Sequence, residues 1–214
     1  MTKIRKQYHF MKLEKKEHWD HVYRTKNADE VSWTQEKPNT SLNLINSFGV
    51  PKTAKIIDIG GGDSKLVDYL LAAGYKNITV LDISAEALEK VKKRLGAKAA
   101  QVHWIVCDIT TFETDTIYDI WHDRAAFHFL TAPAQIQHYI ATAKKAVSGF
   151  LAIGTFSKKG PFKCSGLEII QYSETELKTL MQDGFNALNC TTENHTTPFN
   201  TQQNFLFCSF KRLG

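Results

Sequence analysis

The chain has 214 residues, of which 43% are hydrophobic and 23% charged, and its formal net charge is +5. This composition excludes a disordered chain and is typical of a globular domain, which at this size buries roughly 70% of the surface exposed by its unfolded form. Such a core needs neither disulfides nor a structural metal. We therefore expect one domain over 1–214, with 1–50 as an N-terminal cover and 51–214 as the core.

The positive charge is concentrated near the N-terminus. Six of the 27 basic residues lie within the first sixteen positions, namely Lys3, Arg5, Lys6, Lys12, Lys15 and Lys16. The rest of the chain is close to neutral and carries no RNA-binding motif, so a solvated terminus is a simpler interpretation than a nucleic-acid site. A membrane partner is not expected either, because the apolar runs are far shorter than the roughly 20 residues of a spanning helix.

The cysteine pattern bears on the cellular compartment. Four cysteines, Cys107, Cys164, Cys190 and Cys208, are widely spaced without a CxxC pair, and the N-terminus lacks the apolar run of a secretory signal. This pattern favours a reducing cytoplasm.

From residue 55 onward, short β-branched segments alternate with segments of helical periodicity. The predicted strands are 55–59, 77–82, 102–107, 118–122 and 150–156, and the predicted helices are 64–73, 84–95, 134–147 and 174–182. Segments 185–189 and 204–210 are expected to pair antiparallel at the sheet edge. The pattern predicts an α/β fold: a Rossmann-like, seven-stranded, mostly parallel sheet with helices on both faces and an antiparallel C-terminal hairpin, with residues 1–50 over the top of the sheet.

A glycine turn follows the first predicted strand. It consists of Gly60, Gly61 and Gly62, directly after Asp58 and Ile59. In an open α/β sheet, such a turn lets the backbone approach a ligand at the carboxyl ends of the strands. The spacing matches neither the dinucleotide-binding GxGxxG motif nor a P-loop, so a pyrophosphate site is not indicated.

Two further acids end the second and third predicted strands. Asp82 can accept hydrogen bonds from a ribose diol, and Asp108 can accept one from an exocyclic amine. The strand, the glycine turn and the two acids together fit an adenosine ligand.

The segment IIDIGGGDS and the elements around it resemble the class I S-adenosylmethionine-dependent methyltransferases, over residues 55 to about 156. The resemblance implies S-adenosylmethionine as cofactor and S-adenosylhomocysteine as product. By the same resemblance, the three glycines would pass under the methionine moiety and Asp58 would hold the turn and the amino-acid moiety. Asp82 with Ile83 would contact the ribose, and Asp108 with Ile109 the adenine. The chain also resembles a bacterial group of small class I methyltransferases and, more loosely, enzymes that methylate protein lysines.

Aromatic residues precede the first predicted strand. By resemblance to small-molecule methyltransferases with an N-terminal cover, Trp19, Tyr23 and Trp33 would seal the cofactor site and exclude water from the sulfonium. Ordinary packing of these rings against the sheet is the alternative.

Polar residues are dense after the fourth predicted strand, where the fold places groups that face the transferable methyl. His122, Asp123, Arg124 and His128 are candidate catalytic residues, because buried polar groups near a cofactor must be paired. Cys164, in the defined loop 157–167, is expected to face the same cleft. The alternatives are a structural network of Asp123 with Arg124 and a cysteine that only packs. His195 could reach this cleft from the final hairpin connection or lie in a surface turn.

The chemistry follows from the cofactor, whose sulfonium is already activated, so that the protein must mainly orient and deprotonate the acceptor. His122 or His128 could act as a base, and Arg124 could attract a thiolate or carboxylate. No metal-ligand cluster is visible. His122-Asp123-Arg124-Ala125 stands where DNA and glutamine methyltransferases have NPPF or DPPY.

We therefore expect methyl transfer to a small-molecule nucleophile. The alternatives are a protein-lysine methyltransferase and, with less support, an NAD-dependent oxidoreductase or a non-catalytic nucleotide-binding protein.

Overall fold

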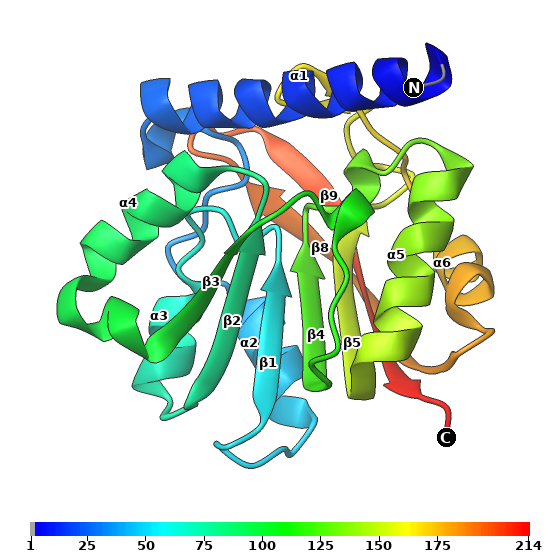
Figure 1. Cartoon of the computed structure of the whole chain (residues 1–214). Helices are drawn as coiled ribbons and strands as arrows, with labels where there is room; N and C mark the ends of the chain where they lie inside the picture. Colours follow the sequence, from blue (N-terminus) through cyan, green and yellow to red (C-terminus); the bar gives the residue numbers. More distant parts are fainter. Residues whose placement is uncertain (1–2) are drawn as a thin grey trace.

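The fold is a seven-stranded sheet with helices on both faces. The computed structural model describes residues 3–214, and side chains from residue 14 onward. The strand order is β3-β2-β1-β4-β5-β9-β8, in which β1 to β5 are parallel and β9 and β8 are antiparallel (Figure 1). The strands are β1 (Lys55–Ile59), β2 (Asn77–Asp82), β3 (Val102–Val106), β4 (Tyr118–Arg124), β5 (Val147–Phe156), β8 (Phe185–Thr196) and β9 (Gln202–Arg212). The predicted fold class is confirmed.

Five of the six α-helices in residues 3–214 form two layers on the faces of this sheet, and α1 (Lys3–Thr25) crosses the carboxyl ends of its strands (Figure 1). The five are α2 (Asn39–Ser47), α3 (Leu66–Ala72), α4 (Ala85–Leu95), α5 (Pro133–Ala146) and α6 (Glu174–Met181). The apolar cluster with α2, α3 and α4 includes Ile45, Leu66, Leu88 and Ile120, and the cluster on the other face, with α5 and α6, includes Trp121 and Tyr139. Burial of such side chains on both faces drives the sheet and helices together.

Local signals in the sequence set the helix boundaries. Ser84 caps α4, because its Oγ accepts a hydrogen bond from the backbone N–H of Ala87 at 3.2 Å. Lys92, Lys93 and Arg94 occupy the last turn, where their charges interact favourably with the helix dipole. At α6, Ser173 and Glu176 form a reciprocal capping box.

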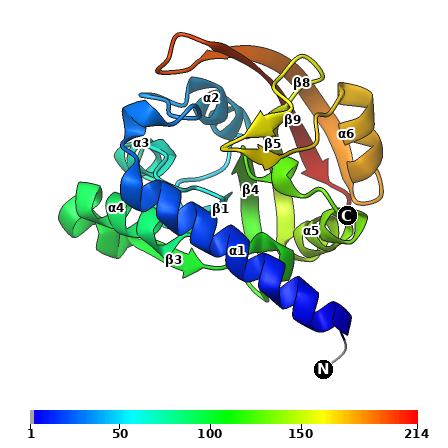
Figure 2. The same cartoon turned by 90° about the horizontal axis from the view of Figure 1, so that it is seen from above.

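The N-terminal residues approach the sheet in two ways. Helix α1 crosses the carboxyl ends of the strands, whereas α2 packs beside β4 and β5 (Figures 1 and 2). Asp20 of α1 accepts a hydrogen bond from Ser84 Oγ at 2.7 Å, and His18 lies 3.3 Å from Ser165 Oγ. The basic side chains of Lys3, Arg5, Lys6 and Lys12 lie outside the described residues. No helix in the described part of the chain is long and apolar enough to cross a membrane.

The loop after β5 contains a short second hairpin. Strands β6 (Lys163–Cys164) and β7 (Leu167–Glu168) pair antiparallel, and the two residues between them, Ser165 and Gly166, have φ angles of +51° and +77°. Two residues with positive φ suit a tight hairpin turn. The expectation of a defined loop over residues 157–167 is confirmed.

The C-terminal hairpin is longer than predicted. Strand β8 reaches Thr196, although its second half lacks a continuous apolar face, because backbone pairing with the buried strand β9 extends it. In this register Cys190 faces Cys208, and the two form a disulfide across a sequence separation of 18. This disulfide counts against the reducing compartment predicted from cysteine spacing, since disulfides persist mainly in oxidising environments.

Candidate functional site

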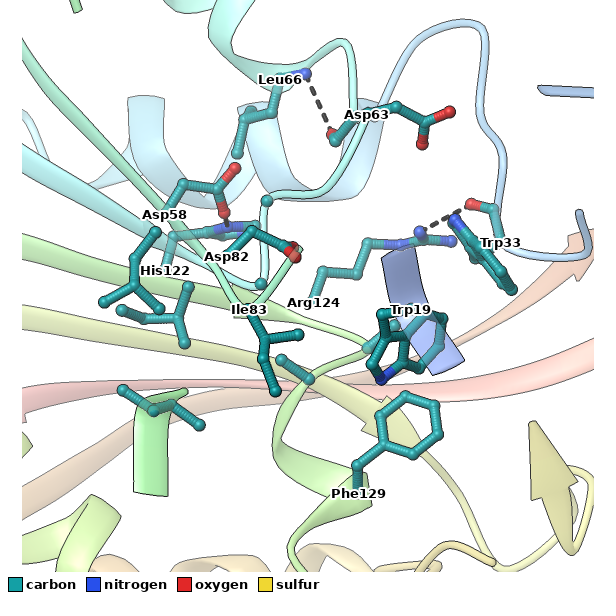
Figure 3. Close-up of a pocket in the computed structure, with 18 of the residues that line it drawn as sticks. Trp19, Trp33, Asp58, Asp63, Leu66, Asp82, Ile83, His122, Arg124 and Phe129 are labelled. Carbon is teal, nitrogen blue, oxygen red and sulfur yellow. Dashed lines mark hydrogen bonds and ion pairs between the residues drawn. The ribbon is translucent and has the colours of Figure 1, made fainter. Parts of the chain in front are cut away.

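A pocket lies at the carboxyl edge of the parallel strands, beneath α1. Asp58, Asp82 and Arg124 reach it from the ends of β1, β2 and β4, and Trp19 and Trp33 enter from the N-terminal cover (Figure 3). Parallel strands end at one edge of the sheet, so residues far apart in the sequence meet there. The pocket lies where the sequence predicted an adenosine ligand.

The glycine turn forms part of the pocket floor. Gly60 and Gly62 have φ angles of +62° and +52°, which glycine adopts without strain. A Cβ at Gly60 would lie 2.5 Å from the Cβ of Ala126, and one at Gly62 would collide with the Tyr23 hydroxyl. Gly60 and Gly61 line the pocket, whereas Gly62 supports it by donating its N–H to Asp82 Oδ2 at 2.8 Å. The backbone therefore comes close to any ligand in the pocket.

Asp82 is the most strongly positioned acid at the pocket. Its Oδ1 accepts a hydrogen bond from the N–H of Ser84 at 2.7 Å, while Oδ2 accepts the one from Gly62. Burial raises the pKa of this carboxyl to about 7, and the charges of Asp58 and Asp63 act in the same direction. Each carboxylate oxygen keeps a second lone pair, so Asp82 can still accept hydrogen bonds from a diol.

The residues predicted to contact adenine lie at the same pocket. Asp108 and Ile109 line it beside Ile83, which follows Asp82. Asp108 Oδ1 accepts a hydrogen bond from the N–H of Thr110 at 2.9 Å, which fixes the direction of the carboxylate. Two acids, Asp82 and Asp108, and the apolar side chains of Ile83 and Ile109 therefore line one pocket.

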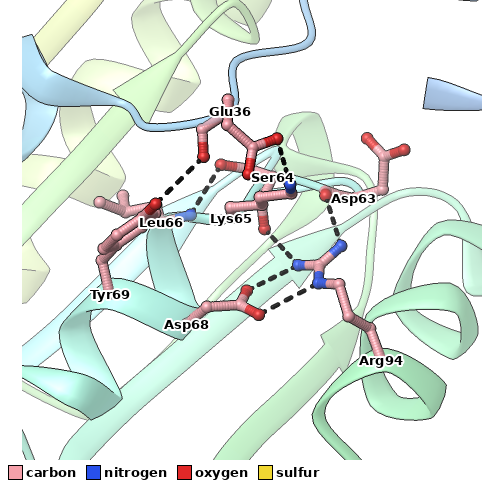
Figure 4. A network of polar contacts seen from close by, with 8 residues as sticks. All are labelled: Glu36, Asp63, Ser64, Lys65, Leu66, Asp68, Tyr69 and Arg94. Carbon is pink, nitrogen blue, oxygen red and sulfur yellow. Dashed lines mark hydrogen bonds and ion pairs between the residues drawn. The ribbon is translucent and has the colours of Figure 1, made fainter. Parts of the chain in front are cut away.

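The loop between the glycine turn and α3 is held by Arg94, at the end of α4. Its guanidinium donates to Asp68 at 2.7 and 3.1 Å and to the backbone carbonyls of Asp63 and Ser64 at 2.9 and 2.8 Å (Figure 4). Arg94 also lines the pocket. The sequence analysis did not single out Arg94, because its partners lie on a different element.

A buried chain of three polar residues runs along one side of the pocket. His122 Nδ1 donates to Asp58 Oδ1 at 2.7 Å, and His122 Nε2 lies 2.8 Å from Ser41 Oγ. All three residues line the pocket and are at most 3% exposed. Ser41, on α2, was missed by the sequence analysis, because no motif links this serine to the glycine turn.

Asp123 and His128 do not line the pocket, so the predicted convergence on one cleft is wrong for these two residues. Side chains alternate along β4, and Asp123 therefore faces away from His122 and Arg124. Its carboxylate accepts hydrogen bonds from the N–H groups of Ala126 and Phe127 and from the Tyr139 hydroxyl. It thereby shapes the turn after β4.

His128 is fully buried and stacks on Phe156, with 4.5 Å between the ring centroids. Burial, together with the charge of Arg124, lowers the pKa of His128 to about 3. Neither ring nitrogen has a hydrogen-bond partner. A neutral imidazole in these surroundings fits a packing role better than a base near pH 7.

Arg124 and Cys164 both line the pocket. Arg124 donates from Nη1 to the carbonyl of Trp33 at 2.9 Å, and its guanidinium lies 4.7 Å from the centroid of the Phe205 ring. Burial lowers the pKa of Arg124 to about 10 and raises the pKa of the Cys164 thiol to about 12. Near pH 7 Arg124 is therefore a cation, and Cys164 is a neutral thiol.

Aromatic rings close the pocket from above. The Trp19 ring lies 5.6 Å from Trp33 and 5.2 Å from Phe129, measured between centroids, in edge-to-face contacts. Tyr23, also at the pocket, is buried, which raises its pKa well above the usual value for a phenol. These rings form the apolar wall that the N-terminal cover was expected to supply.

His195 lies in β8 instead of a surface turn, and it is absent from the pocket lining. It is 5% exposed, and its Nε2 lies 2.7 Å from the carbonyl of Ser32. It therefore ties the segment before Trp33 to the C-terminal hairpin.

Comparison with known proteins places this pocket in a family. Residues 56–148 match the family model of a methyltransferase domain. The match spans less than half of the chain, and together with the seven-stranded fold it agrees with the resemblance to the class I S-adenosylmethionine-dependent methyltransferases. The resemblance and the cofactor predicted from the sequence are confirmed.

The similarity to individual proteins is partial in sequence and extensive in fold. Malonyl-[acyl-carrier protein] O-methyltransferase of Anoxybacillus flavithermus is 34% identical over 105 residues, which are 49% of this chain and 39% of that protein. Human EEF1A lysine methyltransferase 2 is 28% identical over 82 residues, 35% of each protein. The chain thus spans less than two thirds of the length of either relative.

Among solved structures, a Burkholderia thailandensis 1,6-didemethyltoxoflavin-N1-methyltransferase with bound 1,6-didemethyltoxoflavin and S-adenosylhomocysteine has a TM-score of 0.69. It is 17% identical and covers 100% of this chain and 92% of its own. At 17% identity, this similarity shows a shared fold and no more.

Proposed function

We infer that the protein transfers a methyl group from S-adenosylmethionine to a small-molecule nucleophile. The observation that carries this proposal is the apolar wall that Trp19, Trp33 and Phe129 form at the pocket, which Arg124 also lines. An enclosed apolar pocket with few directed polar groups is typical of small-molecule sites.

The residues of this chain fit the cofactor. Gly60 and Gly61 bring the backbone to the wall of the pocket, and Asp82 and Asp108 offer acceptors for the ribose and the adenine. When bound, the cofactor supplies an electrophilic methyl group on a positively charged sulfur. The protein then has to orient the acceptor, exclude water and accept a proton.

His122 is the group best placed to accept that proton. Asp58 orients the ring by accepting from Nδ1, which leaves Nε2 directed at Ser41 Oγ. In this proposal the acceptor gives its proton to Ser41 Oγ as the Ser41 proton moves to His122 Nε2. The resulting imidazolium is stabilised by the Asp58 carboxylate at 2.7 Å.

Methylation of a protein lysine is the second candidate, and one of the relatives is named for that activity. A lysine side chain that enters a pocket needs negative charge near its amino group, whereas this pocket carries the buried guanidinium of Arg124. That charge favours an anionic or thiol-bearing small molecule. An oxidoreductase has less support, since the glycine turn lacks the GxGxxG spacing.

The test uses S-adenosylmethionine with a radiolabelled methyl group. The protein is incubated with panels of small thiols, amines and carboxylates and, separately, with a whole-cell protein extract. We expect label in small molecules, reduced in Asp82→Asn at subsaturating cofactor and retained in Asp115→Asn, an exposed carboxylate 2.8 Å from Lys145 Nζ. Label confined to protein would instead establish the lysine alternative.

A further inference from the structure

One edge of the Arg124 guanidinium, formed by Nε and Nη2, makes no hydrogen bond. Its Nη1 donates to the Trp33 carbonyl, but Nε and Nη2 are buried and have no hydrogen-bond partner. A buried cationic donor without an acceptor is costly, so a group of this kind is usually paired when its site is occupied. Nε and Nη2 are the two parallel donors with which arginine binds a carboxylate through both oxygens.

Two more side chains with polar atoms line the same pocket. The indole Nε1 of Trp33 and the Oγ1 of Thr34 are buried without a well-formed hydrogen bond, although the indole lies close to the Asp63 carboxylate and the Tyr23 hydroxyl. Both residues are next to the guanidinium, since the backbone carbonyl of Trp33 accepts the hydrogen bond from Arg124 Nη1. Two guanidinium N–H donors of Arg124 and the Thr34 hydroxyl therefore lack an acceptor at this pocket.

The position of the guanidinium is fixed before any ligand binds. One side of it lies over the Phe205 ring at 4.7 Å, and Nη1 is held by the Trp33 carbonyl. The other basic residues at the pocket are engaged elsewhere: Arg94 pairs with Asp68 at 2.7 Å, Lys65 pairs with Glu36, and Lys15 Nζ lies 3.4 Å from the Phe129 carbonyl. Arg124 is therefore preorganised to bind an anion.

We propose that the unpaired edge of Arg124, with Thr34 and Trp33, binds a carboxylate group on the methyl acceptor. The carboxylate is a docking group, and a different atom of the acceptor receives the methyl. A singly charged planar anion suits two coplanar donors better than a doubly charged phosphate, because the carboxylates of Asp58 and Glu193 already act on Arg124. This inference rests on the proposed function, since it assumes a small-molecule acceptor in this pocket.

A second carboxylate could bind Arg124, because the methionine moiety of the cofactor also carries one. The two cases differ in a measurable way. If Arg124 holds the cofactor carboxylate, its loss weakens S-adenosylhomocysteine but not 5′-methylthioadenosine, which lacks the amino-acid moiety. If Arg124 holds the acceptor, its loss changes the affinity for neither nucleoside.

The experiment titrates benzoate and hexanoate, with benzamide and hexanamide as neutral controls, into the protein saturated with S-adenosylhomocysteine, and measures binding by ligand-observed NMR. We expect each carboxylate to bind at least about tenfold more tightly than its amide. In Arg124→Lys, which keeps the charge but loses the parallel donors, this preference should fall to about twofold. Thr34→Val should reduce it in part, and its milder change guards against misfolding of the arginine variant.

The outcomes distinguish a failure of the carboxylate-binding role of Arg124 from a failure of the proposed function. Equal affinity for carboxylates and amides in the wild-type complex would overturn the docking role, as would a selective loss of S-adenosylhomocysteine affinity in Arg124→Lys. In both cases the methyltransferase proposal would stand, because wild-type protein would still bind the cofactor product. Failure of wild-type protein to bind S-adenosylhomocysteine would count against the proposed function itself.

Discussion

Individual polar side chains at the end of β4 have different roles because they point to opposite faces of the sheet. His122 and Arg124 share the face that borders the pocket, whereas Asp123, between them, is directed into the other layer. A difference of one position in the strand thus separates a residue that meets the ligand from one that holds a turn. Sequence analysis grouped the three, because adjacency in sequence does not show direction.

Asp82 should make cofactor binding depend on pH. Its raised pKa of about 7 means that the carboxyl is protonated at pH 6, and a ribose hydroxyl donates best to the charged form. Binding below pH 7 must therefore expel a proton. We expect the dissociation constant of S-adenosylhomocysteine, measured by calorimetry, to fall as pH rises from 6 to 8, by up to about tenfold per unit below pH 7.

The control is Asp82→Asn, which does not titrate. This variant should bind about tenfold more weakly at pH 8 and show little change with pH. A wild-type profile that is flat between pH 6 and pH 8 would mean that Asp82 does not contact the ribose in its charged form.

Ser41 provides a test of the proposed proton path. In Ser41→Ala, His122 Nε2 loses its partner at 2.8 Å, and the acceptor loses its link to the imidazole. We expect kcat of methyl transfer to fall by about tenfold or more while S-adenosylhomocysteine affinity stays within about twofold. Ser47→Ala, an exposed serine on the same helix, is the matched control and should behave as wild type. An unchanged kcat in Ser41→Ala would remove this serine from the path.

At the scale of elements, the glycine turn is constrained by its neighbours as well as by the ligand. A Cβ at Gly61 would lie 2.6 Å from Val80 Cγ1 and 2.9 Å from Asp58 Oδ2, so a side chain at this position would crowd the packing of β1 against β2.

Gly61→Ala should therefore destabilise the fold as well as weaken cofactor binding. We expect the free energy of unfolding, from urea denaturation, to decrease by about 1–3 kcal/mol because of overpacking. Val80→Ala removes the atom nearest to the added Cβ. In the Val80→Ala protein, Gly61→Ala should therefore lower the free energy of unfolding by less than it does in the wild-type protein. Full stability of Gly61→Ala would contradict the close packing of β1 against β2.

The disulfide of the C-terminal hairpin also acts at this scale. Cys190 and Cys208 close a loop of a length for which the chain-entropy model gives about 3 kcal/mol. At about 2–4 °C per kcal/mol for a chain of this size, we expect a reductant to lower Tm by about 6–12 °C. The double variant Cys190→Ser, Cys208→Ser should have a lower Tm than the oxidised wild-type protein, and reductant should not change it. Identical Tm values with and without reductant in the wild-type protein would show that the bridge adds no stability.

On the scale of the whole molecule, the pocket is assembled from both ends of the chain. The N-terminal helix α1 crosses above the strands, the β6–β7 hairpin meets it through His18 and Ser165, and Phe205 of β9 supports Arg124 (Figure 2). A ligand below α1 contacts the cover and the sheet at once. Ligand binding should therefore reduce the mobility of the segments around the pocket more than that of the rest of the molecule.

Hydrogen exchange followed by mass spectrometry can test this arrangement. On addition of S-adenosylhomocysteine, we expect increased protection in residues 14–25 and in the glycine turn, and little change in the distant end of the β8–β9 hairpin near residues 185–190. Protection restricted to the glycine turn would show that α1 does not close over the cofactor.

The sequence by itself determined the order of elements, the glycine turn and the acids Asp82 and Asp108, because these features are local or recur at a fixed place after each strand. Only the tertiary structure decided which side chains share the pocket. Ser41 joins His122 across 81 positions, His128 is withdrawn against Phe156, and Cys190 meets Cys208 through the hairpin register. These contacts depend on packing between distant elements and on strand direction, and local sequence patterns encode neither.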